Sequence, residues 1–151
     1  MEQIKIVRVL PTESLDLAPL QAAARSEDYA FVDRAQLDWS SGENRFDDPG
    51  EGFFVAYRGA TIVGMCGLNS DPYLDDPAVG RLRHLYVAPE HRRIGLGRQL
   101  VECCLDLAPP RFDRVRLRTF ETPASRFYEM IGFRLVDEPD ATHSIDLAHC
   151  G

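Results

Sequence analysis

Residues 81–105, RLRHLYVAPEHRRIGLGRQLVECCL, constrain the fold of this chain more than any other segment. The stretch from Arg81 to Val87 is rich in strand-forming residues, and Pro89 cannot donate to a sheet ladder, so a strand should end before it. Gly95 and Gly97 then remove side chains where a helix is expected to begin. The segment therefore predicts a strand, a basic turn and a helix in direct succession.

The basic turn predicts an anion-binding site. The first amide groups of a helix have no intrahelical acceptor and carry the positive end of the helix dipole, so they suit a phosphate or pyrophosphate. Arg92, Arg93 and Arg98 add positive charge beside them. The alternative is an ordinary helix start with surface arginines, because two nearby glycines are a weak signal by themselves.

Two better-known phosphate motifs are excluded by the residues of the turn. A P-loop requires Gly-Lys-Ser/Thr after its glycines, whereas Gly97 is followed by Arg98 and Gln99. A dinucleotide fingerprint requires a third small residue where Leu100 stands, early in a βαβ unit. We therefore expect neither a nucleoside triphosphatase nor a dinucleotide-binding domain.

The same turn resembles the acyl-CoA pyrophosphate loop of the GCN5-related N-acetyltransferases, the GNAT family. The family's Q/R-x-x-G-x-G/A pattern is met by Arg92, Gly95 and Gly97. Residues 114–134, RVRLRTFETPASRFYEMIGFR, resemble the second signature of the family, in which a strand and a short helix lead through a Phe-Tyr-Glu run to Gly-Phe. Thr122-Pro123 predicts the start of that helix and Gly132 its end.

Hydrophobic periodicity predicts the other elements. They are a strand at 4–10, a helix capped by Asp16 that ends near 25–28, a helix at 29–39, hairpin strands at 53–58 and 61–69, and strands at 133–139 and 142–150. The resemblance implies an α/β fold with a mixed, mostly antiparallel central sheet, helices on both faces, and a splay between strands 4 and 5. It also implies that a pantetheine arm lies in the splay along the backbone of residues 85–87.

Length and composition favour one domain over residues 1–151. The chain is 44% hydrophobic, and it contains neither an apolar run of membrane-spanning length nor the cleavage site of a signal peptide, so we expect a cytosolic protein without membrane contact. A net charge of -7 argues against nucleic-acid binding. The cysteines lack metal or disulfide spacing, and we expect reduced thiols at Cys66, Cys103, Cys104 and Cys150.

Six carboxylates flank the first predicted hairpin, and two readings of them stay open. They are expected in loops and could receive a cationic acceptor, or they could be scattered solvated acids. The six are Asp47, Asp48, Glu51, Asp71, Asp75 and Asp76. The loops at 40–51 and 70–80 that carry them are expected to cover the pocket.

The resemblance implies direct acetyl transfer from acetyl-CoA, with Tyr128 as the general acid that protonates the departing thiolate. Many members carry a glutamate base at the position of Arg81, and arginine cannot accept a proton near neutral pH. His84 is the candidate base, directly or through water, and its alternative is a sheet-surface histidine. Glu121 is a second departure, because relatives often have an asparagine there that contacts the cofactor. His143 and His149 lack a metal-binding spacing and are interpreted as structural, so no metal is expected.

The residues that the resemblance places against the cofactor lie on the fourth strand, the turn and the last helix. They are Leu85, Tyr86, Val87, Arg92, Arg93, Ile94, Gly95, Leu96, Gly97, Arg98 and Tyr128. Three functions remain open: an acetyl-CoA-dependent N-acetyltransferase for a small-molecule amine, a protein or peptide acetyltransferase, and a non-catalytic acyl-CoA sensor. The sequence leaves a homodimer open as well.

Overall fold

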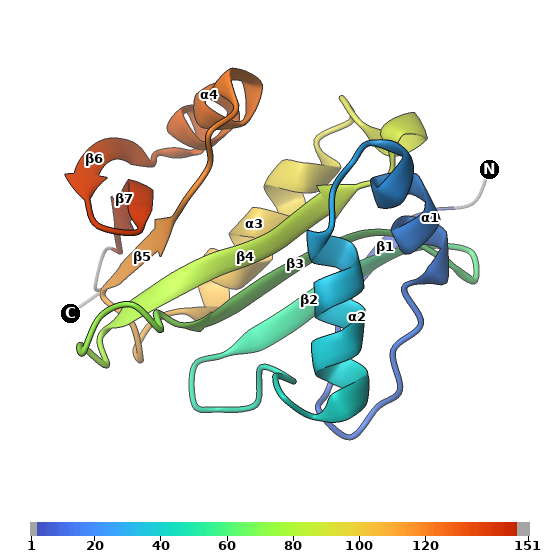
Figure 1. Ribbon diagram of the computed structural model, residues 1–151, viewed down its shortest axis with the longest axis horizontal. Coiled ribbons are helices and arrows are strands. Elements are labelled where there is room, and N and C mark those ends of the chain that lie inside the picture. Colours follow the sequence, from blue (N-terminus) through green and yellow to red (C-terminus); the bar gives the residue numbers. More distant parts are fainter. Residues whose placement is uncertain (1–2, 148–151) are drawn as a thin grey trace.

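The computed structural model describes residues 3–147, which build a seven-stranded sheet with four α-helices around it (Figure 1). The strand order is β1-β2-β3-β4-β5-β7-β6. The strands are β1 Ile4–Arg8, β2 Gly52–Arg58, β3 Thr61–Ser70, β4 Val79–Val87, β5 Arg114–Leu117, β6 Arg134–Glu138 and β7 Ala141–Asp146. The helices are α1 Ala18–Ser26, α2 Phe31–Ser41, the short 3-10 helix η1 Pro89–His91, α3 Leu96–Leu107 and α4 Thr122–Ile131.

Amphipathic helices cover both faces of the sheet, which confirms the expected fold class (Figure 1). Helix α3 buries Leu96, Leu100 and Cys104 against β2, β3 and β4, since these residues recur on one helical face. Helices α1 and α2 bury another set of apolar side chains, including Val32 and Trp39, over β3 and β4. The sheet thus lies between two helical layers, and its strands place the site residues.

The splay expected between the fourth and fifth strands is present, and its cause is a short parallel seam. β4 and β5 pair only over Val79–Arg81 and Arg114–Arg116, and every other strand pair in the sheet is antiparallel. Beyond that seam β4 continues to Val87, while the chain after β5 turns away toward α4 (Figure 1). One edge of β4 is therefore left unpaired by β5 over its second half.

A β-bulge interrupts β4 at His84. Gly67 pairs with Arg83 and Met65 pairs with Tyr86, so β4 carries one residue more than β3 between these pairs. His84 adopts a left-handed backbone with φ of 60°. A bulge bends its strand and re-aims its side chains, and the bend occurs here at the start of the splay.

Two of the six carboxylates expected in the loops that flank the first hairpin are buried and structural. Glu51 is 5% exposed and its carboxylate accepts a hydrogen bond from the Ser70 amide at 2.8 Å. Asp71 is 4% exposed and accepts hydrogen bonds from Arg116 Nε at 2.9 Å and Arg81 Nη1 at 3.3 Å. Burial opposes ionisation of Asp71, but the bonds from Arg116 and the Tyr73 amide hold its pKa below the ordinary value. An acceptor role for this pair is therefore wrong.

Differences from the predicted boundaries are small: the strand predicted at 4–10 ends at Arg8, the helix predicted at 29–39 spans Phe31–Ser41, and two helix starts differ by about a residue. Asp16 is not the N-cap of α1: that residue is Leu17, and Asp16 instead accepts a hydrogen bond from the Ala18 amide at 3.0 Å. Glu121 is the N-cap of α4, so Thr122 is already helical. Cys66, Cys103 and Cys104 are free thiols. His149, Cys150 and the end of the strand predicted at 142–150 lie outside the described residues.

Candidate active site

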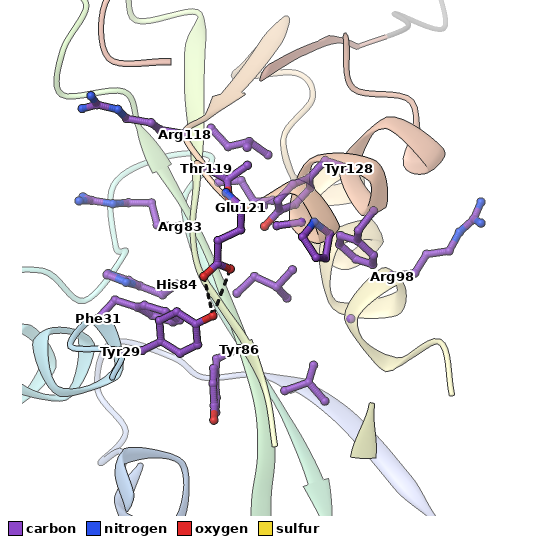
Figure 2. Close-up of a pocket in the computed structure, with 18 of the residues that line it drawn as sticks. Tyr29, Phe31, Arg83, His84, Tyr86, Arg98, Arg118, Thr119, Glu121 and Tyr128 are labelled. Atoms are coloured by element: carbon purple, nitrogen blue, oxygen red, sulfur yellow. Dashed lines mark hydrogen bonds between the residues drawn. The ribbon is translucent and has the colours of Figure 1, made fainter. Parts of the chain in front are cut away.

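A cavity of about 1270 Å³ follows the open edge of β4 (Figure 2). Its walls come from β4 over residues 81–87, the turn over residues 92–98, the end of β5 with the residues after it, and α4. All the site residues predicted from the sequence line it except Ile94, which is 60% exposed and lies outside the lining. The splay therefore brings together side chains from both signatures.

The turn at one end of the cavity has the geometry of an anion cradle. Gly95 is the N-cap of α3 with φ of 83°, a conformation that favours glycine, and no side chain caps the helix. The first amides of α3 are thus available to a ligand. A Cβ built on Gly97 would meet Phe127 Cζ at 3.4 Å, an ordinary contact, so packing alone does not require glycine there.

The three arginines of the turn have different roles. Arg92 donates to both carboxylate oxygens of Glu27 at 2.9 and 2.6 Å and to the Val87 carbonyl at 2.9 Å, which ties the turn to α1 and β4. Arg98 pairs with Glu102 one helical turn later at 2.8 Å. Arg93, with φ of 67°, has no ion-pair partner within residues 3–147. It is the turn arginine whose charge is free for a ligand.

Tyr128 reaches the cavity from α4 (Figure 2). Its ring packs against Phe127 and Phe133, with centroids 5.1 and 5.6 Å away. Burial raises the pKa of Tyr128 above its ordinary value, with Cys66 and Cys104 adding to the shift. The hydroxyl consequently keeps its proton at neutral pH and has it available to donate.

His84 lines the cavity from the bulge in β4, between two aromatic rings. Its ring stacks on Phe31 at 6.3 Å and meets Phe46 edge-on at 6.2 Å. Burial, together with the positive charges of Arg83 and Arg34, lowers the pKa of His84 to about 4. The imidazole is therefore neutral at pH 7, but its basicity is far below that of the exposed histidine assumed from the sequence.

Arg81, at the position of the usual glutamate base, belongs to the buried ion-pair network. Its guanidinium donates to Asp71 at 3.3 Å and to the Asp140 carbonyl at 2.8 Å, and it lies 4.6 Å from the Tyr73 ring centre. Burial lowers the pKa of Arg81, and Asp71 opposes that shift. This side chain stabilises the seam.

Glu121 points across the cavity and accepts hydrogen bonds from the Tyr29 hydroxyl at 2.8 and 3.1 Å (Figure 2). Tyr29 lies between α1 and α2, so the contact bridges the two walls of the splay. The hydrogen bond to Glu121 raises the pKa of the Tyr29 hydroxyl, and burial raises it further. Among the described lining residues, Glu121 bears the sole carboxylate.

Sequence reasoning missed several lining residues, of which three come from segments remote from both signatures and three lie within the signature segments but outside their motif positions. They are Tyr29, Phe31, Tyr73, Arg83, Arg118 and Thr119. Tyr73 comes from the loop at 70–80, as expected for a cover, but no residue of the loop at 40–51 lines the cavity, so that part of the expectation was wrong.

Within residues 3–147 no cluster of His, Cys, Asp and Glu side chains is placed to hold a metal ion. None of the helices in this part of the chain is long and apolar enough to cross a membrane.

The family model described as "Acetyltransferase (GNAT) family" matches residues 15–133 of the chain. A candidate acetyltransferase from Exiguobacterium sp. 255-15 is 30% identical, with a TM-score of 0.82 over 95% of this chain and 93% of that one. A GNAT-family acetyltransferase from Staphylococcus aureus Mu50 is 20% identical, with a TM-score of 0.75 over 97% and 100% of the two chains. A candidate acetyltransferase from Salmonella typhimurium, solved with its cofactor acetyl-CoA, is 16% identical, with a TM-score of 0.70 over 98% and 96%. No curated protein is significantly similar to the chain in sequence.

The fold and the cavity define an acyltransferase of the splayed-sheet type, and the chain belongs to the GNAT acetyltransferase family. Members of this family use acetyl-CoA as co-substrate.

Proposed function

We propose that the protein transfers the acetyl group of acetyl-CoA to a primary amine of a small molecule. The observation that carries the proposal is one continuous cavity, with the cradle of α3 at one end and Tyr128 and His84 along it. The cradle suits the pyrophosphate. The unpaired edge of β4 over Leu85–Val87 offers backbone groups to the pantetheine amides, as an added strand would use them.

The transfer needs one nucleophilic attack and two proton movements. The amine nitrogen bonds to the thioester carbonyl carbon, the carbon–sulfur bond breaks with its electrons going to sulfur, and the new amide loses a proton. Tyr128 is proposed to protonate the departing thiolate, since its hydroxyl carries a proton at neutral pH and faces the cavity. Solvent takes the proton from the nitrogen and returns one to Tyr128, so free coenzyme A and the N-acetylated amine are the net products.

His84 has a different role from the one proposed from the sequence alone. A base with a pKa of about 4 cannot hold a proton taken from an alkylammonium of pKa about 10.4. We therefore propose that the amine enters as the free base, and that neutral His84 orients it by accepting a hydrogen bond. Solvent, or a second molecule of the free amine, removes the proton that the nitrogen loses as the amide forms.

The direct test is coenzyme A release from acetyl-CoA, followed with a thiol reagent in the presence of a panel of primary amines. We expect saturable turnover with at least one small amine, a rise in melting temperature with acetyl-CoA, and unchanged activity after EDTA treatment. A peptide panel run in parallel separates a small-molecule enzyme from a protein acetyltransferase. Turnover restricted to peptides would contradict the proposed acceptor class.

A non-catalytic acyl-CoA sensor is the second candidate, favoured by one observation. The sole carboxylate lining the described cavity is held by Tyr29, and His84 is a weak base, so no side chain there is a strong proton acceptor. Binding of acetyl-CoA without turnover of any amine or peptide would favour the sensor. The cytosolic location, the single domain and the oligomeric state stay predictions.

A further inference from the structure

Arginines occupy alternate positions on the two strands of the parallel seam. Arg81 of β4 lies opposite Arg116 of β5 in register. Side chains alternate along a strand, so Arg83, two residues further along β4, leaves the strand on the same face as Arg81. Arg118 follows directly after the end of β5 at Leu117. Both line the cavity, and Figure 2 shows their side chains pointing the same way. They lie at the point where the strands begin to separate.

The inner arginines of this face are held in short ion pairs, whereas Arg118 has only a loose ion pair with Asp140 and a stacking contact with Phe120, and Arg83 has neither within the described part of the chain. Asp71 and Glu138 form ion pairs of 2.9 to 3.3 Å with Arg81, Arg114 and Arg116. Arg83 has no ion pair or side-chain hydrogen bond with any residue in the range 3–147, and Arg118 Nη1 is 3.7 Å from Asp140 Oδ1, too far for a hydrogen bond. Two guanidinium groups are thus available to a ligand at this end of the cavity.

These two arginines are far from the cradle. Arg83 precedes Val87 by four residues, which a strand rise of about 3.3 Å per residue converts to roughly 13 Å, and the cradle begins beyond Val87. A cofactor whose pyrophosphate occupies the cradle would turn its acyl end toward the bulge at His84. Arg83 lies on the far side of that bulge from the cradle, which leaves this end of the cavity for the acceptor.

We propose that the acceptor is an amine that also carries a carboxylate, as an amino acid does, and that Arg83 and Arg118 bind the carboxylate. The inference rests on the proposed acetyltransferase function and assigns its substrate class. Guanidinium groups bind carboxylates through two parallel hydrogen bonds, which fix orientation as well as charge. The amine of the same molecule then faces His84 and Glu121. A phosphate or phosphonate would present the same kind of anion, and the test separates it.

The test compares matched acceptors that differ only in the anionic group. Phenylalanine is paired with phenethylamine, methionine with 3-(methylthio)propylamine, and O-phosphoethanolamine with ethanolamine, and thiol release gives kcat/KM for each. We expect the carboxylate member of a pair to be at least about tenfold better. Arg83→Gln and Arg118→Gln should each lower its kcat/KM about 10- to 100-fold, mainly through KM, with acetyl-CoA affinity unchanged. Arg126→Gln is the matched control, because Arg126 is exposed and outside the cavity lining.

A binding measurement keeps this inference separate from the transferase proposal. The coenzyme A complex is titrated with N-acetylphenylalanine and with N-acetylphenethylamine, and the shift in melting temperature is recorded for wild type and Arg83→Gln. A carboxylate preference that Arg83→Gln abolishes supports the anion site even if no amine is turned over. Equal binding and equal turnover of the matched pairs overturn it, although acetyl transfer would stand. A preference confined to the phosphate pair overturns the carboxylate assignment.

Discussion

Tyr128 combines two roles that one substitution can separate: its ring packs in the structure, and its hydroxyl is the proposed proton donor. Tyr128→Phe keeps the ring between Phe127 and Phe133 and removes only the proton donor. We expect acetyl-CoA affinity to stay nearly constant and kcat to fall about 10²-fold, the size typical of one general acid. Single-turnover rates measure the transfer step itself. A variant with wild-type single-turnover rates would show that solvent protonates the thiolate.

Gly97 provides the cleanest test of the cradle, because its replacement leaves the fold intact. Gly95 needs its positive φ, whereas Gly97 has room for a Cβ. We expect Gly97→Asp to fold as stably as wild type, since a carboxylate in the first turn of α3 is favourable to the helix dipole, but to lose the thermal stabilisation by acetyl-CoA. Gln99→Asp adds the same charge outside the cavity lining and should retain it. Equal stabilisation of both variants would contradict the cradle.

His84 should make the fold sensitive to mild acid. Its pKa is about 4 in the folded chain and about 6.5 when unfolded, so the unfolded state takes up a proton first as the pH falls. Stability is therefore full above pH 6.5 and falls by up to about 3 kcal/mol on acidification to pH 4. Urea unfolding of His84→Gln should show a shallower loss in that window. Part of the loss of stability with falling pH should remain in this variant, because burial also lowers the pKa of His143.

The same shift predicts the pH–rate profile of the enzyme. Wild type and His84→Gln should both show kcat/KM rising with the deprotonation of the acceptor amine, without a break near pH 6.5. A break at that pH in wild type that His84→Gln removes would restore His84 as the general base.

At the scale of elements, the local sequence pattern was enough to predict helices and strands whose defining contacts are between residues near in sequence. The order of strands and helices followed from periodicity, and Gly95 and Gly132 marked a helix start and a helix end as expected. The bulge at His84 could not be predicted, because it depends on which residue of β3 each residue of β4 meets. A bulge is defined by the pairing of two strands, and the sequence of one strand does not contain that pairing.

The buried ion-pair network holds the seam between β4 and β5, and its central carboxylate is Asp71. Asp71→Asn would leave Arg81 buried without a counter-charge and Arg116 with Glu138 alone. We expect the free energy of unfolding to fall by about 3–5 kcal/mol, as when one partner of a buried pair is removed. Asp75→Asn, on an exposed residue of the same loop, is the control and should change little. A loss below about 1 kcal/mol for Asp71→Asn would mean that the network contributes little stability.

At the scale of the whole molecule, the cofactor end of the site was predictable and the acceptor end was not. The motif around Gly95 and Gly97 is contiguous, so the sequence displays it whole. The other end is assembled from distant segments: Tyr29 meets Glu121 across 92 positions, and Arg83 and Arg118 line one cavity only because β4 and β5 are neighbours in the sheet. Only the three-dimensional arrangement shows such a juxtaposition.

The three-residue seam has a consequence for how the molecule opens. β1–β4 and β5–β7 are each joined by antiparallel ladders, but the two groups share only the pairs at Val79–Arg81. Helix α4 contains no fully buried side chain. We expect native-state hydrogen exchange to reveal β5–β7 and α4 as a separate cooperative unit that opens at lower free energy than the α3-covered strands. Acetyl-CoA, by contacting both walls of the splay, should slow exchange in that unit most, and uniform protection over the whole chain would argue against two units.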